Sequence, residues 1–192
     1  MGSRLRIAAV GVAAAMAATA GGIGFLAPAA QAAPTTVTFS ITQGALTISV
    51  PSTASLNSAV AGAASTYGSL GNTTVSDGRG QVLVGWSVTV SNPTLFTTGA
   101  SPTSNETVAN DHVYYCSGTA TGSGLGAFVP TGLSGNLCTT TVGAQVTTGV
   151  TGASWTQVSG INSQTWNPTL LVSFISSQAS GNYSGTVGQS VA

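Results

Sequence analysis

The stretch GWSVTVS, residues 85–91, decides the fold class that we predict for this chain. Apolar and hydroxyl side chains alternate along it, so Trp86, Val88 and Val90 share one face of an extended strand. The three hydroxyl residues that follow them point to the opposite face. A strand with one apolar and one polar face is typical of an antiparallel sheet that is buried on one side. We therefore expect an antiparallel β protein.

Similar short segments recur on both sides of this strand, which we expect to extend over residues 82–91 after a Gly-rich turn at 76–80. The last segment alternates in the same way, with its odd-numbered residues from Tyr183 to Val191 on one face. Many short strands without a helix of core-forming length predict a two-sheet β-sandwich, with a small β-barrel as the alternative. Further strands are expected at 37–41, 46–50, 113–116, 127–129, 139–150, 154–158 and 170–175.

The first two of these strands are expected to form a hairpin. Val37, Phe39 and Ile41 alternate along the first, and the second alternates in the same way from Leu46 to Val50. The Gln-Gly pair at 43–44 provides the turn between them. Residues 54–67 fit either a short helix or a loop, because their apolar spacing is helical while their Ser, Thr and Gly content is not. Residues 92–111 are expected to be a long polar loop.

The N-terminus has the pattern of an export signal. Arg4 and Arg6 precede an apolar run, and the sequence Ala-Gln-Ala at 30–32 provides the small residues of a signal peptidase site. We expect a signal peptide at 1–32 and a single domain at 33–192, with a retained membrane anchor as the alternative reading of the apolar run. A secreted protein, extracellular or associated with the cell wall, follows from this pattern.

The charge count excludes two classes of partner. Beyond the two signal arginines, Arg79 stands alone against Asp77, Glu106 and Asp111, so the net charge of residues 33–192 is 1 − 3 = −2. A single cation cannot hold a nucleic-acid backbone or an anionic membrane, because such attraction needs several clustered cations. We therefore expect no nucleic-acid partner, and no membrane contact after signal cleavage.

The two cysteines, Cys116 and Cys138, are expected to form a disulfide. Both lie in the exported part, where an oxidising environment favours pairing, and the bond closes a loop worth about 3 kcal/mol in the loop-entropy model. Structural zinc needs four Cys or His ligands, and the chain has only one His besides these thiols. We expect no metal and no cofactor.

The ionisable residues form weak patterns for catalysis. His112 lies beside Asp111, yet no G-x-S-x-G turn supplies a nucleophilic serine, and a polar residue at a loop end is the simpler interpretation. Glu106 and Asp111 could cleave a glycosidic bond or bind calcium, but both lie in a loop and lack the rigid separation or the D-x-D-x-D spacing that these sites require. We therefore expect no enzyme activity, with a glycoside hydrolase as the least favoured alternative.

Two groups of residues are candidates for binding. Asp77 and Arg79 either act as a functional pair or form a local salt bridge that holds the turn. Aromatic rings match the apolar face of a sugar, so Trp155 and Trp166 could build a sugar-stacking platform, with Trp166 as the better candidate for exposure because Asn and Pro follow it. Trp86 is expected in the core.

Two segments resemble the signatures of the WxL domain, found on the surface of Gram-positive bacteria. The first runs from Val75 through the Asp-Gly-Arg-Gly sequence to Ser91, and the second is GNYSGTVGQSV at 181–191. The motifs fall on Trp86-Ser87-Val88 and Gln189-Ser190-Val191; Val stands where the family has Leu in both, and the second Trp is replaced. The resemblance implies a secreted β-sandwich that sits non-covalently on the cell wall through peptidoglycan, often with other surface proteins.

Together these observations predict a secreted, non-catalytic binding module that is associated with the cell surface. Its expected partner is a cell-wall polymer or another surface protein. The alternative is a carbohydrate-binding or adhesive module that uses exposed tryptophans. The residues expected to bind are Asp77, Arg79, Trp86, Trp155 and Trp166.

Overall fold

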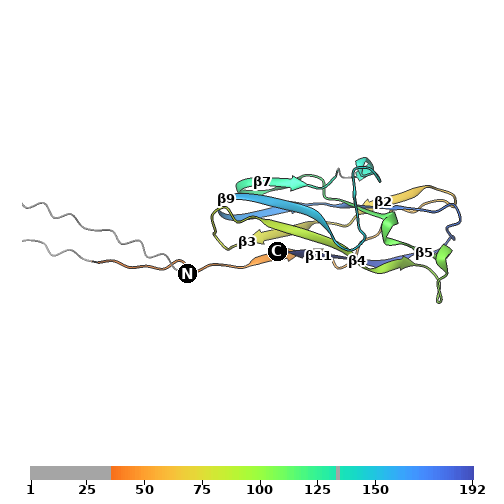
Figure 1. Cartoon of the computed structure of the whole chain (residues 1–192), viewed down its shortest axis with the longest axis horizontal. Helices are drawn as coiled ribbons and strands as arrows, with labels where there is room; N and C mark the ends of the chain where they lie inside the picture. Colours follow the sequence, from red (N-terminus) through yellow and green to blue (C-terminus); the bar gives the residue numbers. More distant parts are fainter. Residues whose placement is uncertain (1–35, 133–134) are drawn as a thin grey trace, which may run out of the picture. The chain divides into compact units, whose positions relative to one another are not determined.

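A computed structural model describes residues 36–132 and 135–192 of the chain (Figure 1). The chain divides after Ser40, and the compact unit Ile41–Ala192 contains every strand of the described part. The expected signal peptide at 1–32 and the expected start of the domain at 33 lie outside the described residues. The part of the chain that the structure describes contains three short 3-10 turns and no α-helix.

The strands form two antiparallel sheets, and neither closes into a barrel. The expected all-β, two-sheet architecture is confirmed, and the small barrel is not what forms. The first sheet has the order β1-β3-β9-β4-β11, with β5 on β4 and β7 on β9: β1 (Leu46–Ser49), β3 (Thr73–Asp77), β4 (Trp86–Thr97), β5 (Thr107–Val108), β7 (Ala120–Pro130), β9 (Val150–Trp166) and β11 (Ser184–Val191). The second has the order β2 (Ser65–Ser69), β10 (Thr169–Ser173), β6 (Val113–Cys116) and β8 (Ala144–Gln145).

Strand β9 organises the larger sheet. One of its edges pairs with β7, beside which it lies in Figure 1, and the other pairs first with β4 and then with β3. The register places Trp86 opposite Trp155 and Asp77 opposite Asn162. The loop at 78–85 connects β3 to β4. In β9, residues 156–161 pair with neither of these two strands.

The core lies between the apolar faces of these strands. Trp86, Val88 and Val90 are all buried, as their alternation predicted, and Tyr183, Val187 and Val191 pack against the same core. The alternation therefore predicted the buried face of β4 and of β11 correctly. Other members of the core are Val75, Val108, Val113, Tyr115, Val146, Ala153, Trp155, Trp166, Leu170 and Val172.

The expected opening hairpin does not form, and this prediction was wrong. Residues 36–45 have no regular secondary structure, and β1 pairs with β3 instead. The reason lies at Gly44, whose N–H donates to the Gly78 carbonyl at 2.9 Å while the Gly78 N–H donates to the Ala45 carbonyl at 2.8 Å. A Cβ at Gly44 would lie 2.7 Å from the Gly78 oxygen, so only glycine allows this approach. Gly44, which was expected in the turn of the hairpin, is therefore used in the contact with Gly78.

Other boundaries also differ from expectation. Residues 54–67 contain no helix, so the loop interpretation holds for them until β2 begins at Ser65. Strand β4 starts four residues later than expected and continues to Thr97, where a polar loop was expected. Residues 139–150 contribute only β8 and the first residue of β9. The Gly-rich stretch after Cys116 is a long edge strand, β7, because its glycines lie against β9.

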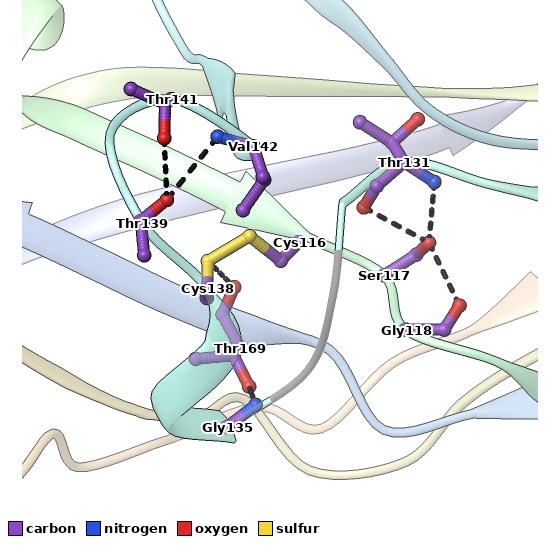
Figure 2. Close-up of a disulfide and its surroundings, with 10 residues drawn as sticks. All are labelled: Cys116, Ser117, Gly118, Thr131, Gly135, Cys138, Thr139, Thr141, Val142 and Thr169. Carbon is purple, nitrogen blue, oxygen red and sulfur yellow. Dashed lines mark hydrogen bonds between the residues drawn. A yellow bond between two sulfur atoms is a disulfide. The ribbon is translucent and has the colours of Figure 1, made fainter.

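The expected disulfide between Cys116 and Cys138 is present, with the Cα atoms 5.8 Å apart (Figure 2). It joins the end of β6 to the residue that follows the 3-10 turn Gly135–Leu137, and both cysteines are fully buried. Around it, the Thr169 hydroxyl accepts a hydrogen bond from the Gly135 N–H at 2.7 Å. The disulfide therefore closes the loop that contains β7.

Candidate functional site

The two residues with the strongest charge interaction, Asp77 and Arg79, lie where β3 leaves the sheet. The Arg79 Nε and Nη2 atoms donate to the two carboxylate oxygens of Asp77, each at 2.9 Å, and the Arg79 backbone N–H donates to the same carboxylate at 3.0 Å. Nη2 also donates to the Gly85 carbonyl at 2.9 Å. The pair therefore joins both ends of the 78–85 loop, which confirms its structural interpretation as a turn-holding salt bridge.

Asn162 of β9 connects this pair to the core. Its amide nitrogen donates to Asp77 at 3.4 Å and to the Gln157 side-chain oxygen, while its oxygen accepts the indole N–H of Trp86 at 2.8 Å. Gln157 in turn donates to the backbone carbonyl of Gln81 at 2.8 Å. These residues form a polar network across the irregular part of the sheet. Sequence reasoning missed Asn162 and Gln157, because polar residues in a strand carry no sign of burial.

The network shifts the ionisation of both charged groups. Hydrogen bonds from Arg79 hold the pKa of the Asp77 carboxyl below its usual value, although burial of the carboxyl opposes the shift. The same hydrogen bonds raise the pKa of Arg79. Because these hydrogen bonds outweigh burial, Asp77 and Arg79 are both charged at neutral pH and neutralise each other, although Asp77 is only 2% exposed. A carboxylate that is already fully paired is poorly placed to bind a ligand.

The tryptophans do not form a sugar-stacking platform, and Trp166, the better candidate for exposure, is buried, as is Trp155. Trp155 is 6% and Trp166 is 2% exposed. The Trp86 ring stacks at 6.5 Å from Trp155 and 6.1 Å from Trp166, and Phe128 packs beside them. The Asn-Pro sequence after Trp166 suggested a surface turn. It joins β9 directly to β10, with Asn167 exposed and Pro168 buried.

Glu106 is occupied by a local contact. Its carboxylate accepts hydrogen bonds from the Thr103 backbone N–H at 2.9 Å and from the Thr103 hydroxyl at 2.8 Å. These two bonds hold the pKa of Glu106 below its usual value. The carboxylate therefore stabilises the 3-10 turn Ser104–Glu106 and is not paired with a second acid for glycoside hydrolysis.

The structure brings a serine to His112 that sequence reasoning did not identify. The Ser173 hydroxyl oxygen lies 3.0 Å from Nδ1 of His112, and it lies 3.3 Å from the His112 carbonyl. Asp111 approaches the other ring nitrogen at 4.0 Å, which is longer than a hydrogen bond. The contact follows from the pairing of β6 with β10, since Val113 lies opposite Val172. A catalytic triad needs a carboxylate that orients the imidazole through a hydrogen bond, and Asp111 does not make one.

No group of three His, Cys, Asp or Glu side chains in residues 36–132 and 135–192 is arranged to hold a metal ion. Within the same residues, no helix has the length and hydropathy of a membrane span.

The two segments that resemble WxL signatures lie side by side in the larger sheet. Strand β11 pairs with β4 so that Val191 lies opposite Val88 and Ser190 opposite Thr89. Beyond the last strand residue, Ala192 exchanges two backbone hydrogen bonds with Ser87, at 2.9 and 3.0 Å. Segments about 100 residues apart in sequence therefore form one continuous surface.

The outward side of this surface carries hydroxyl groups, and we call it the hydroxyl face. Register places its members in neighbouring positions: Ser154 opposite Ser87, Thr151 opposite Thr89, and Ser190 opposite Thr89 on the other side. None of the side-chain hydrogen bonds found among the described residues involves the hydroxyl oxygens of this face. On the other half of the sheet, by contrast, Thr74 and Thr165 hydrogen-bond to each other. The members of the hydroxyl face are Ser87, Thr89, Thr151, Ser154, Thr156 and Ser190.

A groove of about 630 Å³ lies elsewhere on the unit, between the loop at 54–63 and the segment 174–185. Its floor includes Phe96, Val108 and Val172, and its rim carries backbone and amide groups. It contains none of the acidic residues, His112 or Arg79. It therefore offers shape and apolar contact without groups for acid–base chemistry.

Comparison with protein-family models, curated proteins and solved structures found no match to this chain.

Proposed function

We propose that this chain is a non-catalytic binding module of the cell surface and that its hydroxyl face contacts an uncharged, hydroxyl-rich polymer. The observation that carries the proposal is the pairing of β4 with β11, which places Ser87, Thr89 and Ser190 outward on one surface with hydroxyl groups free for a ligand. Hydroxyl groups both donate and accept hydrogen bonds, as the hydroxyls of a glycan do. The glycan strands of peptidoglycan are the candidate polymer.

The distribution of charge supports a binding role. Asp77 and Arg79 neutralise each other inside the polar network, and Glu106 is held by its own turn. These two acids therefore serve local structure, whereas general acid–base catalysis needs groups that are free to exchange protons with a substrate. The hydroxyl face itself contains no charged residue.

Two further observations support a position outside the cytoplasm. The disulfide between Cys116 and Cys138 is of a kind that persists in oxidising compartments. The sequence at 1–32 has the composition of an export signal. The resemblance to WxL signatures adds the cell wall as the expected location, and another surface protein as a second type of partner.

The structure changes the role that we assign to Trp86. This residue carries the first signature, but it is 3% exposed and its indole N–H is bonded to Asn162. A buried ring cannot stack on a sugar. We therefore assign Trp86, Asp77 and Arg79 to holding β4 in register, which sets the spacing of the hydroxyl groups on its outward side.

A pull-down on isolated peptidoglycan tests the proposal. The full chain is expressed with its own N-terminal segment in a secreting bacterial host, and the recovered product is incubated with peptidoglycan or with a soluble polysaccharide. Changing Thr89→Val together with Ser190→Ala removes two neighbouring hydroxyl groups from the face. We expect binding to fall about tenfold or more, since each lost hydrogen bond is worth about 1 kcal/mol.

The matched control is Thr53→Val with Ser58→Ala, which removes the same two groups from an exposed loop away from the sheet. This control should bind as the parent does. Equal binding by both double variants, with unchanged circular dichroism, would show that the hydroxyl face is not the site. Binding to neither polymer would reject the proposed ligand class.

A further inference from the structure

The loop at 78–85 presents three consecutive apolar side chains to solvent. Val82 is 65%, Leu83 is 77% and Val84 is 40% exposed, and we call these three residues the apolar tip. On the adjacent part of β9, Val158 and Ile161 are also exposed. The Leu83 N–H donates to the Val158 carbonyl at 3.3 Å, so the two segments lie against each other. A contiguous group of large exposed apolar side chains marks an interaction site.

The backbone of the apolar tip has a strained conformation. Leu83 has a φ of 59°, and among the described residues no other residue besides glycine has a positive φ. This left-handed conformation is unfavourable for leucine, because its Cβ crowds the following carbonyl oxygen, whereas Asn, Asp and Gly adopt it more easily. Strain of this kind is found at functional sites. A leucine here is therefore better explained by a contact of its side chain than by the needs of the turn.

The polar network holds the apolar tip in place. Arg79 donates to Asp77 at one end of the loop and to the Gly85 carbonyl at the other. Gln157 donates to the Gln81 carbonyl at 2.8 Å, immediately before the tip. A loop that is already ordered loses little conformational entropy when it binds. The network therefore pre-organises the tip for a contact.

The groove between the loop at 54–63 and the segment 174–185 offers a matching surface. Its floor includes Phe96, Val108 and Val172, and its volume of about 630 Å³ lies within the range of pockets that enclose a small ligand, about 300–1,000 Å³. Three aliphatic side chains are no larger than such a ligand. Neither the lining of the groove nor residues 80–84 contain a charged residue. A projecting apolar loop and an apolar groove are therefore complementary.

The apolar tip cannot fill the groove of its own copy. The tip lies just before Trp86, where β4 begins, whereas Phe96 of the groove lies near the end of the same strand. Ten residues of extended strand separate the two by about 33 Å. Figure 1 shows β5, whose Val108 lines the groove, at one end of the unit and the turn that follows β3 at the other. Only the tip of another copy can therefore reach the groove.

We propose that the apolar tip of one copy inserts into the groove of a second copy, so that the chain assembles head to tail. The two surfaces are different and each copy carries both, so the contact produces rings or open filaments rather than a closed symmetric dimer. A lipid bilayer is the less suitable occupant, because Arg79 is the one cation of residues 33–192 and Asp77 neutralises it. The contact uses no residue of the hydroxyl face.

Sedimentation velocity over a wide range of protein concentration tests the assembly. The full chain is produced in a secreting host, and we expect species larger than a monomer that grow with concentration. Leu83→Asp should weaken association about 30-fold or more, because it places a charge at the centre of an apolar contact. Since Asp adopts a positive φ more readily than Leu, the thermal midpoint of the monomer should not fall. Val142→Asp, at an exposed residue outside both surfaces, is the control and should associate as the parent does.

The groove is tested by Ile175→Asp, with Leu95→Asp as its matched control. Both residues are 37% exposed, but only Ile175 lines the groove, so only its change should block association. Val60→Asp, at the exposed rim, repeats the test should circular dichroism show that Ile175→Asp does not fold. A mixture of the Leu83→Asp and Ile175→Asp proteins combines one intact groove with one intact tip. We expect this mixture to form a one-to-one dimer and nothing larger.

Several results would overturn the proposal. These are a parent protein that remains monomeric at every concentration, association that survives Leu83→Asp or the groove variants, or a mixture that does not dimerise. Binding of a monomeric parent to phosphatidylcholine vesicles, lost in Leu83→Asp, would assign the tip to a membrane instead. The outcome is independent of polymer binding, since the pull-down uses changes at Thr89 and Ser190 while assembly uses changes in the tip and the groove.

Discussion

Two segments of this chain have the same alternating pattern and different secondary structure. In β4, Trp86, Val88 and Val90 form a buried strand face, whereas residues 37–41 have no regular secondary structure. Strand β4 is fixed by its neighbours, with β9 on one side and β11 on the other. Period-two alternation thus indicates that a segment can form a strand, and does not identify its partner.

The largest expected effect comes from the buried member of this comparison. Trp86→Ala removes a ring that packs on two other tryptophans and leaves Asn162 without its indole donor. We expect the free energy of unfolding to fall by about 3–5 kcal/mol. Urea denaturation followed by circular dichroism measures it. A loss below about 1 kcal/mol would mean that the tryptophan stack does not anchor the two halves of β9.

The polar network that fixes β4 in register should be nearly as sensitive. Asp77→Ala leaves Arg79 without its carboxylate partner in a partly buried site. We expect a loss of about 3 kcal/mol in the free energy of unfolding, since removing one partner of such a pair leaves the other charge uncompensated. Thermal denaturation at neutral pH checks this. The Glu106→Ala variant, in an exposed turn, provides the comparison and should lose much less stability.

Removal of the disulfide tests how the edge strand β7 is held. In the Cys116→Ser, Cys138→Ser double variant the loop that contains β7 is no longer closed. We expect the free energy of unfolding to fall by about 2–3 kcal/mol, with amide hydrogen exchange in β7 increasing more than in β4. Uniform exchange in the two strands would contradict a special role of the disulfide for β7.

The pH dependence of stability has a defined sign. The folded-state pKa of Asp77 is lowered, so its contribution is fully present above the pKa of the unfolded state, about 3.9, and is lost as pH falls through the lower folded pKa. We therefore expect stability to decrease below about pH 4. Denaturation midpoints measured across this range should depend on pH less steeply in Asp77→Asn than in the parent protein.

The smallest effect is expected in residues 37–41, which form no strand. Phe39→Ala should change the free energy of unfolding of the monomer by less than about 0.5 kcal/mol, since Phe39 lies outside the strands that form the core. The measurement is made on a dilute sample to exclude association. A loss comparable to that of Trp86→Ala would mean that the segment packs on its own chain, and the contrast between the two segments would disappear.

Local pattern in the sequence was sufficient for much of the fold. The apolar faces of β4 and β11, the pairing of the two cysteines and the salt bridge of Asp77 with Arg79 all depend on residues close in sequence or few in number. These predictions succeeded because alternation is a direct consequence of strand geometry. In contrast, the burial of Trp166 depends on β6 and β10, so the Asn-Pro sequence beside it was misleading.

The candidate site was less accessible to such reasoning. The hydroxyl face requires that β4 and β11 pair, and these strands are about 100 residues apart in sequence. A serine or threonine on a strand looks the same whether its neighbours are paired or free. Asn162 and Gln157 escaped notice for the same reason, because a buried polar residue is recognised only through its partners.

The sequence by itself determined that this chain forms antiparallel strands with one apolar side, closes a disulfide and carries almost no charge for binding or catalysis. Only the tertiary structure decided which strands are neighbours, and therefore that the tryptophans are buried and that hydroxyl groups gather on one face. The physical reason is that side-chain direction follows from the local backbone, whereas burial depends on contacts between residues far apart in the chain.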